Sequence, residues 1–245
     1  MKAMILAAGF GSRLRPLTDR VPKPLVEVGG RPLIAYPLAL VRAAGIREVV
    51  INLHHHGAAI RAALGDGRGY GVSIRYSEED PILDTGGGIL HARPLLGDEP
   101  FVVLNSDSII DLDLRALIAW HRARGAIATM VLRHDPVAAR YGLIEIDRQH
   151  RVRRFLGQPA QVDEPLTALM FAGVHVLDPQ VFGYMASGVF GITRQTYPAM
   201  LAAGCPVSGY VFDGYWRVLD THMLLAEGRY DFSVGDGPLR PENRP

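Results

Sequence analysis

The chain has 245 residues, of which 48% are hydrophobic and 21% are charged, an ordinary balance for a globular protein with a sizeable core. A formal net charge of +1 excludes a strong overall attraction to nucleic acid or acidic membrane, so any anion must be bound by local groups of cations. One cysteine, Cys205, and no apolar run near the roughly 20 residues of a membrane span predict a cytoplasmic protein without disulfides, nucleic-acid partners or membrane partners.

Short apolar, β-branched runs alternate with helix-like stretches through the first half of the chain. Strands buried on both faces are predicted at 2–7, 48–53, 72–77 and 101–105. Helices that end at glycine are predicted at 31–45, 55–65 and 86–97. Pro37 and Pro94 predict that the first and third helices are kinked or begin late. The alternation predicts an α/β fold with a mostly parallel sheet.

After residue 107 the pattern changes to a mixture of strands and helices. A helix is predicted at 113–124 with Asp113 as its N-cap, and Asp111 and Asp113 both fit the turn into it. Strands are predicted near 126–133, 141–146, 151–156, 168–177 and 207–212, and helices near 178–186, 192–203 and from Thr221. We expect one domain over residues 1–234 with a mixed sheet and no appended β-helix, followed by a disordered tail at 235–245.

The stretch LAAGFGSRLRPLTDRVPKPL (6–25) directly follows the first predicted strand and is rich in glycine and cations. Gly9 and Gly11 allow a sharp turn and bring backbone N–H groups close to an anion, although a plain strand-to-loop turn explains the glycines alone equally well. Arg13 offers a bidentate guanidinium, and Lys23 offers a compact ammonium between two prolines that restrict the backbone. The combination favours a loop that binds a triphosphate over a solvated basic loop.

This stretch resembles the signature of the sugar-1-phosphate nucleotidyltransferases, which include guanylyl-, uridylyl- and thymidylyltransferases. The resemblance continues in LDTGGGI (83–89), VLNSD (103–107), RYGLIEID (140–147) and GYWRVLDT (214–221), so it covers nearly the whole chain apart from the tail. It implies a Rossmann-like fold of the nucleotide-diphospho-sugar transferase type. In that fold, residues up to about 110 bind the nucleotide, and residues from about 111 to 234 bind the sugar phosphate.

The resemblance implies a Mg²⁺-dependent reaction in which an NTP and a sugar 1-phosphate form an NDP-sugar and pyrophosphate. Arg13 would neutralise the leaving pyrophosphate and Lys23 would bridge the approaching phosphates, which fits the need to align two polyanions. Asp107 ends a strand where ligands gather in open α/β sheets and suits Mg²⁺, with a turn or helix cap as the alternative. The other nucleotide contacts that the resemblance implies are Leu6, Ala7, Ala8, Gly9, Gly11, Ser12, Glu79, Thr85 and Gly86.

Several of these positions also have purely structural explanations. Thr85 is predicted as the N-cap of the helix in LDTGGGI, whose glycines would let a base approach the backbone. The Glu79 carboxylate either accepts hydrogen bonds from a base edge or faces solvent within the acidic run SEED. Tyr141 and Gly142 match the family's sugar-contacting segment, and a turn that starts a strand is the alternative.

Three consecutive histidines, 54–56, look like a metal cluster at first sight. Consecutive side chains point in different directions, however, and the sequence suggests no partner carboxylate. A helix start or an exposed surface is therefore the favoured interpretation.

The sequence departs from the family pattern at two places. Gly157 and Gln158 stand where the family has Glu-Lys, so a cation expected on the sugar phosphate is missing; Arg153, Arg154 and Arg194 are candidates to replace it. Val218 stands where the family has its second magnesium-binding aspartate, and Asp220 lies two residues further on. If 216–220 is a strand, both side chains share one face about 7 Å apart. Either Asp220 takes over the metal or the second ligand is lost.

The resemblance is closest to mannose-1-phosphate guanylyltransferases, because of VLNSD, RYG and GITRQTYP, so GTP is the first expected nucleotide. LDTGGGI also resembles short uridylyltransferases that act on N-acetylmuramate 1-phosphate, which makes UTP the alternative. A third hypothesis is a regulatory homologue that binds nucleotide sugar without turnover, motivated by Val218 and by the missing Glu-Lys pair. Formation of a homo-oligomer is left open.

Overall fold

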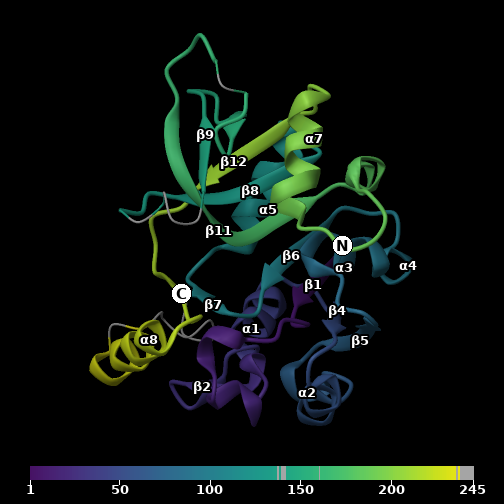
Figure 1. The fold of residues 1–245 in the computed structure, drawn as a ribbon, viewed down its shortest axis with the longest axis vertical. Helices are drawn as coiled ribbons and strands as arrows, with labels where there is room; N and C mark the ends of the chain where they lie inside the picture. Colours follow the sequence, from purple (N-terminus) through teal and green to yellow (C-terminus); the bar gives the residue numbers. More distant parts are fainter. Residues whose placement is uncertain (137, 139–141, 160, 236, 238–245) are drawn as a thin grey trace.

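A computed structural model describes residues 1–136, 138, 142–159, 161–235 and 237 of the chain, built around a central sheet (Figure 1). The sheet strands are β1 (Lys2–Leu6), β4 (Glu48–Leu53), β5 (Ser73–Glu78), β6 (Phe101–Asn105), β8 (Ala128–Arg133), β9 (Leu143–Ile146), β10 (Val152–Phe155), β11 (Thr167–Leu177) and β12 (Val207–Val211). Within the described residues their order is β10-β9-β11-β6-β1-β4-β5, and β8 joins β11 to β12. Every strand predicted from the sequence is present to within about three residues at each end.

The sheet has a parallel part and an antiparallel part. Strand β1 pairs in parallel with β4 and β6, and β4 pairs in parallel with β5. The long strand β11 runs antiparallel to β6, β8 and β9. The N-terminal half of the chain therefore supplies the parallel edge where ligands bind in α/β folds, and the predicted mixed, mostly parallel sheet is confirmed.

Helices cover both faces of the sheet because alternate strand residues point to opposite sides. In β1, Ala3 and Ile5 belong to one apolar cluster and Met4 to the other. The helices are α1 (Ala35–Ala43), α2 (Gly57–Leu64), α3 (Asp84–His91), α4 (Arg93–Leu96), α5 (Leu114–Arg124), α7 (Tyr197–Ala202) and α8 (His222–Val234). Residues of α1, α2 and α5 pack in the first cluster, and residues of α3, α4 and α7 pack in the second.

Local sequence signals explain where several helices begin. The Asp113 carboxylate accepts hydrogen bonds from the backbone N–H groups of Arg115 and Ala116, so the predicted N-cap of α5 is confirmed. Helix α1 begins late, and the third predicted helix is divided into α3 and α4 with Pro94 in the first turn of α4. The two prolines thus act as expected, since proline is tolerated only near a helix start.

A smaller layer lies beside the carboxyl edge of the sheet. Strand β7 (Ser108–Ile110) pairs with β13 (Trp216–Val218), and β2 (Glu27–Val28) pairs with β3 (Arg31–Pro32). Helix α8 lies next to β2 in the lower part of Figure 1. No β-helix follows among the described residues, as expected, and none of the helices described is long and apolar enough to cross a membrane.

Two expectations about the organisation of the chain have no structural outcome. The tail predicted as disordered, 235–245, lies outside the described residues except for Gly235 and Gly237. The division into a nucleotide-binding half and a sugar-phosphate-binding half stays a prediction.

Candidate active site

A cavity of about 280 Å³ opens at the carboxyl ends of β1, β4 and β6. These ends are level because Leu6 lies opposite Asn52 of β4 and Asn105 of β6. The cavity is lined by Leu6, Ala7, Ala8, Gly9, Gly11, Ser12, Arg13, Lys23, Pro24, Asn52, Glu79, Ile82, Asp84, Thr85, Asn105, Ser106, Asp107 and Asp220. The sequence-predicted site residues outside this set are Gly86, Gly142 and Tyr141, of which Tyr141 lies outside the described residues.

The glycine-rich loop after β1 is a tight turn that also forms one wall of the cavity. Gly11 adopts a left-handed conformation (φ +63°) and starts a short 3₁₀ turn at Ser12–Leu14, and its carbonyl accepts a hydrogen bond from the Thr18 hydroxyl at 2.9 Å. A Cβ at Gly11 would lie 3.0 Å from Thr18, whereas a Cβ at Gly9 would meet nothing within 4 Å. The protein itself therefore requires glycine at position 11, and position 9 is open toward the space where a ligand would lie.

Two pairs of a cation and a carboxylate face this cavity. The Lys23 ammonium lies 2.8 Å from Oδ2 of Asp107, and the Arg13 guanidinium lies 2.5 Å from Oδ2 of Asp220. Lys23 comes from a 3₁₀ turn (Lys23–Leu25) that follows Pro22, and Asp107 lies between β6 and β7. The Asp220 side chain is only 5% exposed, while that of Arg13 is 66% exposed. Each cation that the sequence assigned to phosphate is thus neutralised by a carboxylate of the site.

Asp220 reaches the cavity from a turn rather than from a strand. Strand β13 ends at Val218, opposite Ser108 of β7, and the backbone N–H of Leu219 donates to the carbonyl of Asp107 at 2.8 Å. The strand is therefore two residues shorter than the range that underlies the 7 Å estimate. Because β13 is paired with the strand that follows Asp107, the two aspartates line the same cavity, as the alternative of a displaced ligand requires.

The donor set of the cavity fits Mg²⁺. This ion is usually held by one or two carboxylates together with substrate phosphates and water, and Asp107 and Asp220 supply the carboxylates. Oδ1 of Asp220 is buried without a hydrogen-bond partner among the described residues, so it has an unused acceptor. No group of three or more His, Cys, Asp or Glu side chains suited to a metal occurs in that part of the chain.

Glu79 is buried, which excludes the alternative in which it faces solvent within the acidic run. It is 4% exposed, and its Oε1 accepts a hydrogen bond from Nδ2 of Asn52 at 2.7 Å. Its Oε2 accepts from the backbone N–H of Leu83 at 2.9 Å. Asn52 also accepts from the backbone N–H of Ala7 at 2.8 Å, so it connects the glycine-rich loop to the carboxylate. The alternative role of Glu79, contact with a base edge, stays a prediction.

Thr85 is not the N-cap of its helix, contrary to the sequence prediction. Helix α3 begins at Asp84, two residues earlier than predicted, with Leu83 as its N-cap, and the Thr85 hydroxyl accepts a hydrogen bond from the backbone N–H of Ile192 at 3.0 Å. The N–H of Gly86 donates to the carbonyl of Phe190, and a Cβ at Gly86 would lie 2.2 Å from the Phe190 ring. The glycine run therefore lets α3 pack against residues 188–192, and this packing by itself requires glycine at position 86. Contact of Gly86 with the nucleotide stays a prediction.

The described residues that were expected at the sugar-phosphate end of the site do not line the cavity. Gly142 has φ +92° just before β9 and does not line the cavity, so the alternative of a strand-initiating turn describes it. Arg153 pairs with Glu164 at 2.8 Å and Arg154 with Glu145 at 3.0 Å, and neither lines the cavity. Arg194 is exposed and is likewise absent from the lining. Replacement of the missing lysine by one of the three arginines stays a prediction.

The three histidines lie at the start of α2, as the sequence indicated. His56 has φ +53° and is the N-cap residue, and the ring of Phe10 packs against His54 and His55 with centroids 5.5 and 5.2 Å away. Burial and the neighbouring His56 lower the pKa of His55 below its ordinary value. The imidazoles of His54 and His55 therefore pack against Phe10 of the glycine-rich loop, and Nδ1 of His54 also lies 2.9 Å from the carbonyl oxygen of Glu79.

Comparison with known proteins agrees with this geometry. The family model described as nucleotidyl transferase matches residues 2–226. The chain belongs to the nucleotidyl transferase family. The N-acetylmuramate α-1-phosphate uridylyltransferase of Neisseria meningitidis is 41% identical over 94% of this chain and 97% of its own length. The mannose-1-phosphate guanylyltransferase of Mycobacterium tuberculosis is 34% identical over 96% of this chain and 66% of its own length.

Some family members are longer than this chain. The chain spans 59% of the UTP–glucose-1-phosphate uridylyltransferase of Synechocystis, to which it is 33% identical. Among solved structures, HddC of Yersinia pseudotuberculosis in complex with GMP-PN has a TM-score of 0.77 at 21% identity, covering 94% of this chain and 99% of the other. Similarity at 21% identity shows the fold alone and does not identify the substrates of this chain.

The structure adds two features of this family member that the sequence analysis did not identify. Asn52 lies at the end of β4 and connects Ala7 to Glu79, and a polar residue closing an apolar parallel strand was the available signal. The pairing of Lys23 with Asp107 and of Arg13 with Asp220 spans 84 and 207 residues of sequence, so no local pattern could predict it.

Proposed function

We propose that this chain transfers a nucleotidyl group from an NTP to a sugar 1-phosphate. A phosphate oxygen of the sugar 1-phosphate forms a bond to the α-phosphorus, the bond from that phosphorus to the bridging oxygen breaks, and pyrophosphate leaves. The observation that carries the proposal is the placement of Arg13, Lys23, Asp107 and Asp220 on one cavity at the carboxyl edge of a parallel sheet. No protein nucleophile is needed, because alignment and charge neutralisation supply the catalysis.

The two ion pairs provide a way to hold the cations ready for phosphate. Without ligand, Lys23 and Arg13 are compensated by Asp107 and Asp220 and stay in place beside the glycine-rich loop. When the triphosphate enters, both cations transfer their hydrogen bonds to phosphate oxygens, which are stronger partners for a guanidinium or an ammonium. Mg²⁺, held by the two freed carboxylates, would neutralise further charge on the phosphates.

Two observations favour UTP as the nucleotide over GTP. The uridylyltransferase of Neisseria meningitidis matches over nearly its whole length, whereas the guanylyltransferase of Mycobacterium tuberculosis matches over 66% of its length. A carboxylate that recognises guanine accepts hydrogen bonds from N1–H and N2–H, and acceptor sites already occupied within the protein weaken that recognition. Both oxygens of Glu79 are already engaged by Asn52 and Leu83, and a Cβ at Gly88 would lie 2.5 Å from Oε1.

The test is pyrophosphate release by the purified chain with each of the four NTPs and a panel of sugar 1-phosphates, including those of N-acetylmuramate, glucose and mannose. We expect UTP to be preferred over GTP by at least about 10-fold in kcat/KM, the scale of the net free energy of one hydrogen bond. A preference for GTP would replace UTP by GTP within the same proposal. Equal rates with all four NTPs would refute the nucleotide assignment.

The proposed metal role of Asp107 can be tested in the same assay. Asp107→Asn should remove the stimulation by Mg²⁺ together with the activity, whereas Asp113→Asn, which changes a helix cap outside the cavity, should leave the Mg²⁺ dependence unchanged. An Asp107→Asn variant that Mg²⁺ still stimulates normally would refute the proposed metal role.

A second candidate function is a protein that binds nucleotide sugar without turnover. Val218 in place of an aspartate, together with the absence of a third cation among the described cavity residues, favours it. In that case the wild type should bind UDP- or GDP-sugar in calorimetry, show no pyrophosphate release, and gain turnover on Val218→Asp. Turnover by the wild type would exclude this candidate.

A further inference from the structure

Helix α8 packs directly on the segment that presents Asp220. Leu219 and Leu225 lie in one buried apolar cluster with Leu14 and Ile109. Gly228 faces this segment without a side chain, and a Cβ there would lie 2.4 Å from Cδ2 of Leu219. The helix and the residue before Asp220 are therefore in contact with no space between them, so a shift of one displaces the other.

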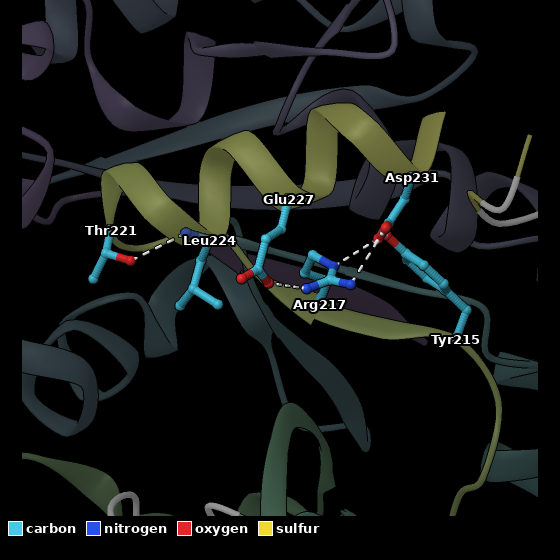
Figure 2. Close-up of polar contacts among 6 residues, drawn as sticks. All are labelled: Tyr215, Arg217, Thr221, Leu224, Glu227 and Asp231. Atoms are coloured by element: carbon cyan, nitrogen blue, oxygen red, sulfur yellow. Dashed lines mark hydrogen bonds and ion pairs between the residues drawn. The ribbon is translucent and has the colours of Figure 1, made fainter. Parts of the chain in front are cut away.

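A polar cluster fixes the orientation of β13 against this helix (Figure 2). The guanidinium of Arg217 donates to Asp231 through Nε at 2.6 Å and through Nη2 at 3.3 Å, and through Nη1 to Glu227 at 2.6 Å. The Tyr215 hydroxyl donates to the same Oδ2 of Asp231 at 2.7 Å. The planar guanidinium of Arg217 binds two carboxylates that lie one helical turn apart on α8, and this geometry fixes the position of β13 along the helix.

Asp220 lies in the short connection between these two fixed elements. Strand β13 ends at Val218 and α8 begins at His222, where Thr221 is the N-cap and accepts from the N–H of Leu224. At the same helix end, the His222 ring lies 2.8 Å from the carbonyl of Arg15, two residues after Arg13. The helix thus fixes both partners of the Arg13–Asp220 pair: the aspartate through Arg217, and the arginine loop through His222.

We propose that Arg217 is a positioning residue that holds Asp220 in the cavity through its contacts with Asp231 and Glu227 on α8. It does not line the cavity, so it acts on the reaction only through Asp220. The role in the reaction rests on the proposed nucleotidyl transfer. Loss of the guanidinium frees the connection at 219–221 and lowers the turnover rate, whereas nucleotide binding by the loop at 6–13 is retained.

The kinetic test compares Arg217→Met, Arg217→Lys, Asp231→Asn and the double variant Arg217→Met/Asp231→Asn. Arg217→Met should lower kcat about 10-fold and change KM for the NTP less than about twofold. The lysine variant should recover part of the rate. The double variant should be no slower than the slower single variant, because both changes break one contact. Additive losses, or a rise in KM alone, would overturn the proposal. Arg68→Met is the control, since Arg68 forms an exposed pair with Asp66 elsewhere.

Hydrogen exchange tests the positioning without turnover. The N–H of Leu219 donates to Asp107, so the segment 216–222 should exchange about 10-fold faster in Arg217→Met and in Asp231→Asn than in the wild type. The segment 48–53 in β4 should be unchanged in both variants. Unchanged exchange at 216–222 would overturn the proposal even if the wild type transfers nucleotide. An inactive wild type with faster exchange in the variants would refute the proposed function and leave the positioning role supported.

Discussion

The Arg13–Asp220 pair is asymmetric, and this predicts opposite effects of removing its two members. Asp220 is 5% exposed at its side chain and has one buried oxygen without a hydrogen-bond partner among the described residues. Arg13 is 66% exposed and loses little hydration in the folded state. Nearly all of the desolvation cost of the pair therefore falls on the carboxylate, and an unsatisfied buried acceptor costs about 1–3 kcal/mol.

Asp220→Asn removes the buried charge and leaves an exposed arginine that water can solvate. We expect the free energy of unfolding to stay constant or to rise by up to about 1 kcal/mol. Arg13→Met removes the partner of a buried carboxylate. Removal of one member of a fully buried pair costs about 3–5 kcal/mol, and the exposure of Arg13 reduces our expectation to about 2 kcal/mol. Both variants should lose about 10²-fold in pyrophosphate release, the usual cost of one preorganised electrostatic group.

Urea unfolding gives the stabilities and a coupled pyrophosphate assay gives the rates. Arg20→Met, an exposed arginine of the same loop that does not line the cavity, is the matched control and should change neither quantity. The reasoning is refuted if Asp220→Asn unfolds more than about 1 kcal/mol more easily than the wild type while it keeps its activity. That result would mean that Asp220 is a structural residue of the turn between β13 and α8.

Three further predictions concern other parts of the molecule. Gly9→Ala should change the free energy of unfolding by less than about 0.5 kcal/mol and raise KM for the NTP. Gly86→Ala should lower the free energy of unfolding in urea by about 1–3 kcal/mol, because its Cβ overlaps the Phe190 ring. Equal stabilities of the two variants would contradict this packing argument. Asn52→Ala should lower the free energy of unfolding by about 1–3 kcal/mol and raise KM for the NTP, because the Ala7 N–H and the Glu79 carboxylate both lose a buried hydrogen-bond partner. An unchanged KM would show that Glu79 does not need Asn52 for nucleotide binding. Burial lowers the pKa of His175 to about 3 in the folded state, from 6.5 in the unfolded state. Between these two pH values only the unfolded state binds a proton on this imidazole, so the free energy of unfolding decreases as the pH falls from 6.5 toward 3. Between pH 7 and pH 5 the loss should be about 2 kcal/mol, and His175→Gln should lack this part of the dependence; parallel pH curves for the two proteins would exclude His175 as the source.

The elements of the fold were predictable because each carries a local signal. Strands such as β4 and β6 are continuous apolar runs, and α5 begins at an aspartate that caps it. The short strands of the β2–β3 and β7–β13 pairs were not predicted, because two or three residues show no periodicity. The partner of β13 also lies more than 100 residues away in the sequence. Thr85 shows the same limit: its hydroxyl bonds Ile192 across 107 residues, and this tertiary contact replaces the predicted cap.

Several residues of the candidate site were predictable from their type and spacing, but their partners were not. Glycines and cations in LAAGFGSRLRPLTDRVPKPL indicated phosphate, and the structure places Arg13 and Lys23 on the cavity. The sequence could not show that Glu79 is buried, because its neighbours Glu78 and Asp80 are acidic too and its partners come from other segments of the chain. Burial of one carboxylate in an acidic run is decided by the hydrogen bonds from Asn52 and Leu83, which come from β4 and from the start of α3.

Val218 and Asp220 show how a departure from the family pattern is accommodated by the surrounding structure. An aspartate at 218 would belong to β13 and be positioned by the strand pairing itself, whereas Asp220 lies past the strand end and has no ladder hydrogen bond of its own to hold it. A carboxylate on such a turn needs support from elsewhere, and the chain provides it on both sides: Arg217 bound to α8 before it, and the Thr221 cap after it. If this support is what makes Asp220 effective, then Val218→Asp in an Arg217→Met background should restore the transfer rate, because the new carboxylate is held by the pairing of β13 with β7 and not by the connection at 219–221. Failure of that double variant, with the single Val218→Asp active, would show that α8 positions more of the site than Asp220.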